Sequence, residues 1–165
     1  MAQAAIGEGK YAQAFPSFGP ERRGAPVQAF VRISGSQIRI RAEVTEPDIV
    51  MVLDPGLLSI VKVTSGLAKN GLLVVNAKSP EVIPAEARAQ YRIATVDANR
   101  IAREVLGVTI VNTTMIGALL KAAGVVALEA LNGPMQKRFG KLTEKNLATL
   151  KRAYDETAVE EVSRA

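Results

Sequence analysis

The chain has 165 residues and a formal net charge of +5, and it contains neither Cys nor His. Without Cys there is no disulfide, no thiolate nucleophile and no thiolate ligand for zinc or an iron–sulfur cluster. Without His the usual general base and the commonest metal ligand at neutral pH are both missing. The composition therefore argues against a self-contained hydrolase or metalloenzyme. It leaves the difficult step of any catalysis to a cofactor or another subunit.

The length and the 48% share of hydrophobic residues predict one domain over residues 1–165. The apolar runs are shorter than the roughly 18 to 20 residues that span a bilayer. The first eight residues lack the basic start and long apolar stretch of a signal peptide. We therefore expect a cytoplasmic protein with no membrane partner.

Residues 1–8 are rich in Ala and predict a helix that glycines end, and residues 11–15 predict a short strand. Apolar and polar residues alternate in 27–33 and again in 38–44, with Ser-Gly-Ser between the two runs. We expect these runs to pair as an antiparallel hairpin with its arginines on one solvent-exposed face.

The loop from Phe15 to Pro26 combines three prolines and two glycines with the adjacent pair Arg22 and Arg23. Gly and Pro restrict the backbone of such a loop, so its side chains are held in place. Residues 10–41 hold six basic residues against one acid, and therefore carry the whole net charge of +5. The rest of the chain is balanced.

Three roles for Arg22 and Arg23 remain open: gripping phosphates of a small molecule, pairing with carboxylates of a partner, or pairing with the domain's own acids. Of these, the interface role is slightly favoured. We do not expect nucleic acid as a partner, because the basic block is short and has few aromatic residues. Gly19 and Gly24 are expected to shape the backbone of the loop.

Short continuous apolar runs follow, as expected for strands buried on both faces of a parallel sheet. They are residues 49–53, 72–75, 93–96 and 108–111, each followed by Asp or Asn. Helices are predicted between them, over 56–67, 99–106 and 115–123. This alternation predicts an α/β fold, a doubly wound and mostly parallel sheet that carries a β-hairpin and a C-terminal helix.

Asn112 and Thr113 lie between the last of these strands and the helix expected near Met115. Because helix N-termini attract anions, this turn is a candidate site for a phosphate or carboxylate. The ordinary alternative, which we favour, is helix capping by Thr113 or Thr114. Asp54 and Asp97 are likewise expected to cap strand ends, and we assign no catalytic residue.

The last quarter of the chain is predicted to be helical. Residues 128–139 contain Gly133-Pro134, which is expected to break the helix. From Thr143, a reasonable N-cap, apolar residues recur at helical spacing, and the helix is expected to pack on its own domain more readily than on a partner.

Several of these segments resemble one family. The stretch Gly9–Pro26 closely resembles the gamma subunit of pyruvate and related 2-oxoacid:ferredoxin oxidoreductases, and the resemblance continues through Glu46–Asp54, Leu72–Asn76, Asn112–Leu119 and the closing Ala153-Tyr154 helix. Members of this family begin with a strand and a Gly-rich loop that precede the helix in which Met1 would fall. This sequence shows neither.

The resemblance implies a subunit of a complex that decarboxylates a 2-oxoacid on thiamine diphosphate and Mg, passes electrons through iron–sulfur clusters to ferredoxin, and transfers the acyl group to coenzyme A. The thiamine and cluster sites lie on other subunits in this family, so no cofactor or metal is expected on this chain alone. The gamma subunit is implied to dock on the catalytic subunits near the coenzyme A end of the site.

Within that resemblance, the candidates for contact with a cofactor are Arg22, Arg23, Asn112 and Thr113. Phe18, Gly19, Glu21 and Gly24 are expected to shape the loop or the interface. The alternative function is a free-standing nucleotide- or anion-binding α/β module. It is disfavoured because the sequence holds no Gly-rich phosphate loop.

Overall fold

The computed structural model describes residues 1–17 and 26–162, and within them it shows two separate sheets with helices packed around the larger one. The helices are α1 (Ala2–Gly7), α2 (Leu57–Ile60), α3 (Ala85–Gln90), α4 (Ala98–Leu106), α5 (Asn112–Ala123), α6 (Asn132–Phe139) and α7 (Thr143–Glu156), with 3₁₀ turns η1 (Pro80–Val82), η2 (Glu129–Leu131) and η3 (Gly140–Leu142). The strands are β1 (Tyr11–Pro16), β2 (Ala29–Ser34), β3 (Ile49–Val52), β4 (Leu72–Asn76), β5 (Arg92–Val96) and β6 (Ala158–Glu160).

The larger sheet has the order β3-β4-β5-β6. Its strands β3, β4 and β5 run parallel, and β6 pairs antiparallel with β5 at the edge. Every residue of β4 is buried, as expected for a central strand with both faces covered. Three of the four apolar runs that the sequence indicated therefore form the centre of the fold.

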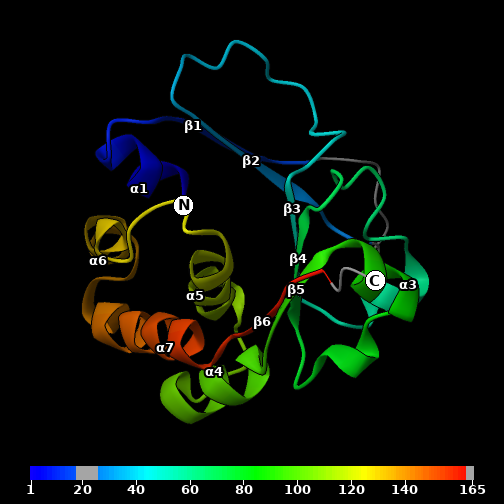
Figure 1. Cartoon of the computed structure of the whole chain (residues 1–165). Helices are drawn as coiled ribbons and strands as arrows, with labels where there is room; N and C mark the ends of the chain where they lie inside the picture. The colour runs from blue at the N-terminus through cyan, green and yellow to red at the C-terminus, as the bar shows by residue number, and fades with distance from the viewer. Residues whose placement is uncertain (18–25, 163–165) are drawn as a thin grey trace.

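Helices cover both faces of this sheet. One face packs Leu72, Val74 and Ala94 against α4, α5 and α7, while the other packs Leu73 and Val75 beneath the segment after β3 and α3. Figure 1 shows α4, α5, α6 and α7 on one side of the sheet and α3 on the other. The predicted doubly wound α/β fold is confirmed.

The β1–β2 hairpin forms the second sheet, and it packs mainly on α1 rather than on the larger sheet. At the root of the hairpin, Ala12 and Ile33 join a cluster with Ala4, Ala5 and Leu131. In Figure 1 the hairpin is drawn in blue at the upper side of the molecule, and its strands run separately from the larger sheet.

The predicted partner of residues 27–33 is wrong. Residues 29–34 pair with β1, from Tyr11 opposite Ser34 to Pro16 opposite Ala29, and residues 38–44 form no strand. Side chains explain the difference, because Gln13 donates to the carbonyl of Ile38 (3.2 Å) and Arg32 to that of Glu43 (3.0 Å). The backbone of this segment is thus bound by side chains instead of by a strand ladder.

The strand predicted over 108–111 and the long helix predicted over 56–67 are also wrong. Val108 and Ile110 are exposed, and the sheet position beyond β5 is taken by β6 from the end of the chain. The helix α2 ends at Ile60 because Val61 adopts an extended backbone. Further on, Gly66 has a φ of +76°, where the carbonyl oxygen of Thr45 would lie 2.1 Å from any added Cβ.

Two predicted features of the C-terminal helices need correction. Gly133 and Pro134 lie in the first turn of α6, where a proline's missing N–H costs nothing, so they begin the helix instead of breaking one. Thr143 is the first residue of α7 rather than its N-cap, and its hydroxyl donates to the carbonyl of Gly140 (2.6 Å). The packing of α7 on its own domain is confirmed, since Leu150 is buried against α5 and α6.

Candidate functional site

The unusual stretch of the sequence connects the two strands of the hairpin. Pro16 pairs with Ala29, and the backbone N–H of Ser17 donates to the carbonyl of Gln28 (2.9 Å). The hydroxyl of Ser17 also donates to Glu43 (2.7 Å). The two ends of the loop are therefore fixed beside each other. The predicted site residues Phe18, Gly19, Glu21, Arg22, Arg23 and Gly24 lie outside the described residues.

The start of the hairpin is bound to the rest of the domain by two charged side chains. Glu8 accepts a hydrogen bond from the backbone N–H of Ala127 (2.6 Å), and Lys10 donates to the carbonyl of Val125 (2.7 Å) and to Glu8 (2.9 Å). The hydrogen bond from Lys10, followed by that from Ala127, holds the pKa of Glu8 below its ordinary value. These contacts fix the direction in which β1 leaves α1.

The structure places Asn112 and Thr113 inside the first turn of α5, because this helix begins at Asn112 and not near Met115. No threonine side chain caps it. Instead, the Oδ1 atom of Asn112 accepts a hydrogen bond from the N–H of Thr113 (2.8 Å). Thr113 is buried and Asn112 is exposed, so Asn112 is the member of the pair that a ligand or partner can reach. Their role in binding stays a prediction.

The carboxyl edge of the parallel sheet is held together by Asn76, which is only 3% exposed. Its amide donates to the carbonyl of Leu53 at the end of β3 (2.9 Å), and its Oδ1 accepts from the N–H of Ala98 at the start of α4 (3.0 Å). One side chain thus links the ends of β3 and β4 with the start of α4. The sequence showed a polar residue after β4 but gave no sign of this bridge.

Asp54 and Asp97, expected to cap strand ends, both accept backbone hydrogen bonds just after their strands, and Asp97 is also the N-cap of α4. Asp97 accepts from the N–H of Arg100 (3.0 Å) at the first turn of α4, and Asp54 accepts from the N–H of Gly56 (2.9 Å). Both carboxylates are thus engaged by backbone N–H groups two or three residues further along the chain.

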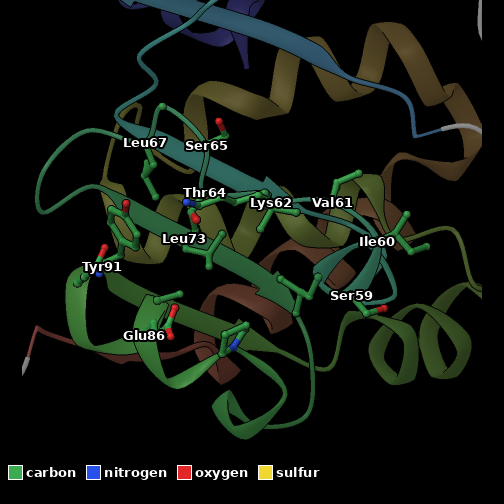
Figure 2. A pocket seen from close by; sticks show the side chains of 16 residues that line it. Ser59, Ile60, Val61, Lys62, Thr64, Ser65, Leu67, Leu73, Glu86 and Tyr91 are labelled. Carbon is green, nitrogen blue, oxygen red and sulfur yellow. The ribbon is translucent and has the colours of Figure 1, made fainter.

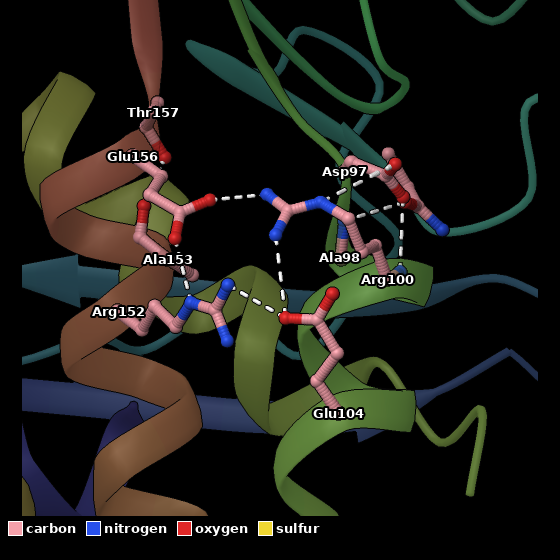
Figure 3. Close-up of polar contacts among 9 residues, drawn as sticks. Asp97, Ala98, Arg100, Glu104, Arg152, Ala153, Glu156 and Thr157 are labelled. Carbon is pink, nitrogen blue, oxygen red and sulfur yellow. Dashed lines mark hydrogen bonds and ion pairs between the residues drawn. The ribbon is translucent and has the colours of Figure 1, made fainter.

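An ion-pair network joins α4 to α7 (Figure 3). Arg152 pairs with Glu104 (2.7 Å) and with Glu156 (2.6 Å), and Arg100 pairs with Glu156 and Glu104. Chiefly the hydrogen bond from Arg152 holds the pKa of Glu156 below its ordinary value. The i,i+4 spacing of Arg100–Glu104 and of Arg152–Glu156 is a sequence signal for an ion pair within each helix. The ion pairs between the two helices could not be predicted from spacing.

A cleft of about 730 Å³ lies between the segment after β3 and α3, with Leu73 of β4 among its lining (Figure 2). Among the described residues that line it, Lys62 is the one cation and Glu86 the one carboxylate. The remaining lining mixes hydroxyls with aliphatic side chains. This arrangement offers no cluster of cations for a polyphosphate.

The part of the chain that the structure describes contains no group of three or more His, Cys, Asp or Glu arranged to hold a metal ion. Over the same residues, none of the helices has the length and apolar character needed to cross a membrane.

Comparison with known proteins identifies the family of the chain. Residues 1–156 match the family described as pyruvate ferredoxin/flavodoxin oxidoreductase. The chain belongs to this family. The resemblance to its gamma subunits that the sequence motifs indicated is confirmed.

Particular relatives are similar over nearly their full length. The pyruvate/ketoisovalerate oxidoreductases common subunit gamma of Pyrococcus furiosus is 47% identical over 165 residues, which cover 98% of this chain and 89% of that protein. The pyruvate synthase subunit PorC of Methanocaldococcus jannaschii is 45% identical over 157 residues, 94% of this chain and 85% of the relative. The crystal structure of pyruvate oxidoreductase subunit PORC from Thermotoga maritima superposes with a TM-score of 0.80 at 38% identity, covering 97% of this chain and 87% of that one. These relatives are named as subunits and not as complete enzymes.

Proposed function

We propose that this chain is the gamma subunit of a 2-oxoacid:ferredoxin oxidoreductase that acts on pyruvate or a related 2-oxoacid. In this proposal it docks on the subunits that carry thiamine diphosphate and the iron–sulfur clusters, and it borders the coenzyme A side of their site. The observation that carries the proposal is the family match over residues 1–156, together with relatives about half identical across almost the whole chain.

The residue types of the chain support a binding role in such a complex. Iron–sulfur clusters need thiolate ligands, and the sequence contains no Cys, so this chain does not fit such a cluster. The carboxylates at the carboxyl edge of the sheet, Asp54 and Asp97, are occupied by backbone N–H groups. Oxidation, electron transfer and thiamine chemistry therefore belong to the partner chains in this proposal.

We assign Arg22 and Arg23 to the docking of the partner subunit or to the phosphates of coenzyme A, with the interface favoured. The planar guanidinium group binds carboxylates and phosphates with two parallel hydrogen bonds, provided that its position is fixed. Support comes from the loop's two ends, because Ser17 and Gln28 are hydrogen-bonded to each other. Phe18, Gly19, Glu21 and Gly24 are proposed to shape this loop, and Asn112 with Thr113 to offer a second polar contact.

The proposal is tested by expressing the tagged chain in its source organism and identifying the chains that co-purify with it. We expect the thiamine- and cluster-binding chains to co-purify with it, and the chain alone to show no 2-oxoacid-dependent electron transfer. Isolation of the chain by itself, with tight binding of a nucleotide, would instead support the free-standing anion-binding module.

The loop is tested by the double variant Arg22→Ala/Arg23→Ala. We expect about tenfold or greater weakening of assembly, or a similar rise in the coenzyme A concentration needed, with an unchanged melting temperature. The matched control is Lys137→Ala/Arg138→Ala, an exposed adjacent cationic pair on α6, which should assemble normally. Normal assembly and turnover of the Arg22/Arg23 variant would show that the loop is only structural.

A further inference from the structure

The β1–β2 hairpin has one face whose apolar side chains continue from the core onto the surface. Because side chains alternate between the faces of a strand, the pairs Ala12/Ile33, Ala14/Val31 and Pro16/Ala29 share this face. The first pair packs into the core beside α1. Val31 in the second pair is 46% exposed, and Ala14, Pro16 and Ala29 are exposed as well.

This uncovered region is the apolar strip, made of Ala14, Pro16, Val27, Ala29 and Val31. Val27 lies at the end of the strip beyond β2, on the same alternation, and is 73% exposed. Two-stranded hairpins are only marginally stable in water without packing on another surface. Only the root of this hairpin packs on the domain core, so most of one face has no partner within the described residues.

The opposite face of the hairpin is covered by the chain itself. Phe15 and Phe30 pack together with ring centroids 5.7 Å apart, and the guanidinium of Arg32 lies 5.8 Å from the ring centroid of Phe15. Gln13 and Arg32, which are directly opposite each other, bind the carbonyls of Ile38 and Glu43. The following segment therefore holds the hairpin from one side and leaves the apolar strip facing outward.

Charge distinguishes between the possible occupants of the strip. The hairpin and its flanks lie in residues 10–41, which carry the whole net charge of the chain, and Arg39 and Arg41 of the covering segment are exposed. Neither of them forms an ion pair with a described residue. A second copy of this chain would bring two such cationic regions together, which is unfavourable, whereas an acidic partner is attracted.

We infer that the apolar strip is an interface for another subunit of the oxidoreductase complex, one that presents an apolar patch bordered by carboxylates. This inference rests on the proposed function and adds a specific surface to it. The strip contributes apolar contact area, while the net positive charge of residues 10–41 attracts an acidic partner and speeds its association. The partner is a different polypeptide and not a second copy.

The test is co-purification of the other subunits with tagged full-length chain carrying Val31→Glu. We expect the yield of complex to fall by about tenfold or more, because a charge would be buried in the apolar contact. The matched control is Leu142→Glu, at a position 57% exposed between α6 and α7, which should assemble like the unmodified chain. Circular dichroism melts check that both variants fold.

If Val31→Glu does not fold, the isosteric variant Val31→Thr tests the inference in its place. Thr keeps the β-branched shape and replaces one methyl group with a hydroxyl, so this variant should weaken assembly by a few-fold. Normal assembly of the folded Val31 variant would overturn the inference while leaving the proposed function intact. Failure of the unmodified chain to co-purify would overturn the proposed function itself. A dimer of the chain alone that Val31→Glu dissociates would show that the occupant is a second copy.

Discussion

The close contact of α5 with α7 at Gly117 yields the sharpest prediction about stability. A Cβ built at Gly117 would lie 2.0 Å from the carbonyl oxygen of Leu150 and 3.0 Å from the backbone N of Tyr154. These neighbours are backbone atoms in the middle of a helix, so they cannot rotate away as a side chain would. The substitution Gly117→Ala must therefore push the two helices apart.

The size of the effect follows from two opposing contributions. Ala is favoured over Gly in a helix interior by about 1 kcal/mol. Overpacking a well-packed core typically costs about 1 to 3 kcal/mol and more where backbone must move, and separating the helices also loosens Met115 and Leu150, which are fully buried. We expect a net loss of roughly 2 to 3 kcal/mol in the free energy of unfolding, or about 4 to 12 °C in melting temperature for a chain of this size.

Urea unfolding followed by circular dichroism measures this loss directly. The matched control is Gly133→Ala in α6, where nothing lies within 4 Å of an added Cβ and the helix should be unchanged or slightly stabilised. A Gly117→Ala variant more stable than the unmodified chain would refute the packing argument, because the propensity gain alone would then account for the result.

Three further predictions concern the carboxyl edge, the ion-pair network and the charge of the hairpin. Asn76→Ala leaves the carbonyl of Leu53 and the N–H of Ala98 without their partner. Urea titration should show that the free energy of unfolding falls by about 2 to 4 kcal/mol. A loss below about 0.5 kcal/mol would contradict the structural role of this bridge. The pKa of Glu156 is held below its ordinary value of 4.5. The ionised Glu156 carboxylate therefore stabilises the folded chain fully at pH values above 4.5, and this stabilisation is lost as the pH falls through the lowered pKa. Glu156→Gln should therefore melt at a lower temperature at pH 7 and lose less stability between pH 5 and pH 3, and an acid profile parallel to that of the unmodified chain would count against the network. Finally, dissociation of the complex should increase with salt, and Arg39→Glu/Arg41→Glu should slow its association, as a stopped-flow measurement would show; salt-independent association would argue against an acidic partner.

The central strands of the fold were predictable from the sequence because burial on both faces leaves a plain signature. Leu72–Asn76 and Arg92–Val96 contain continuous apolar runs that end in polar residues, and both lie in the sheet as expected. The apolar run at 108–111 has the same local pattern but no place in the sheet, since β6 occupies the edge beside β5. Local pattern does not show which of several candidate strands fills an edge.

The pairing of the hairpin could not be predicted for a related reason. Residues 11–15, 27–33 and 38–44 all look like strands, and the closest pair in sequence was expected to join. The structure instead joins the first two across the Gly/Pro-rich loop, and Gln13 and Arg32 bind the third by its carbonyls. These bonds depend on side chains brought together by the hairpin itself, which no local pattern records.

For the candidate site, the sequence indicated the family, while the local geometry around the site could not be predicted. The unusual composition of Phe15–Pro26 identified the loop, and the family comparison agrees with the resemblance that the loop carried. The start of α5 was expected three residues too late: the helix begins at Asn112, whose Oδ1 accepts from the N–H of Thr113, and both threonines lie within the helix. The apolar strip was not foreseen, since its exposure depends on which face of β2 the covering segment occupies.

The most direct test of the account is coenzyme A-dependent electron transfer from a 2-oxoacid to ferredoxin, measured on the other subunits with and without this chain. The account predicts low turnover by the other subunits alone, full turnover after this chain is added, and poor recovery with the Val31→Glu chain. Equal turnover in the presence and absence of the chain would contradict its role as a working subunit of the complex.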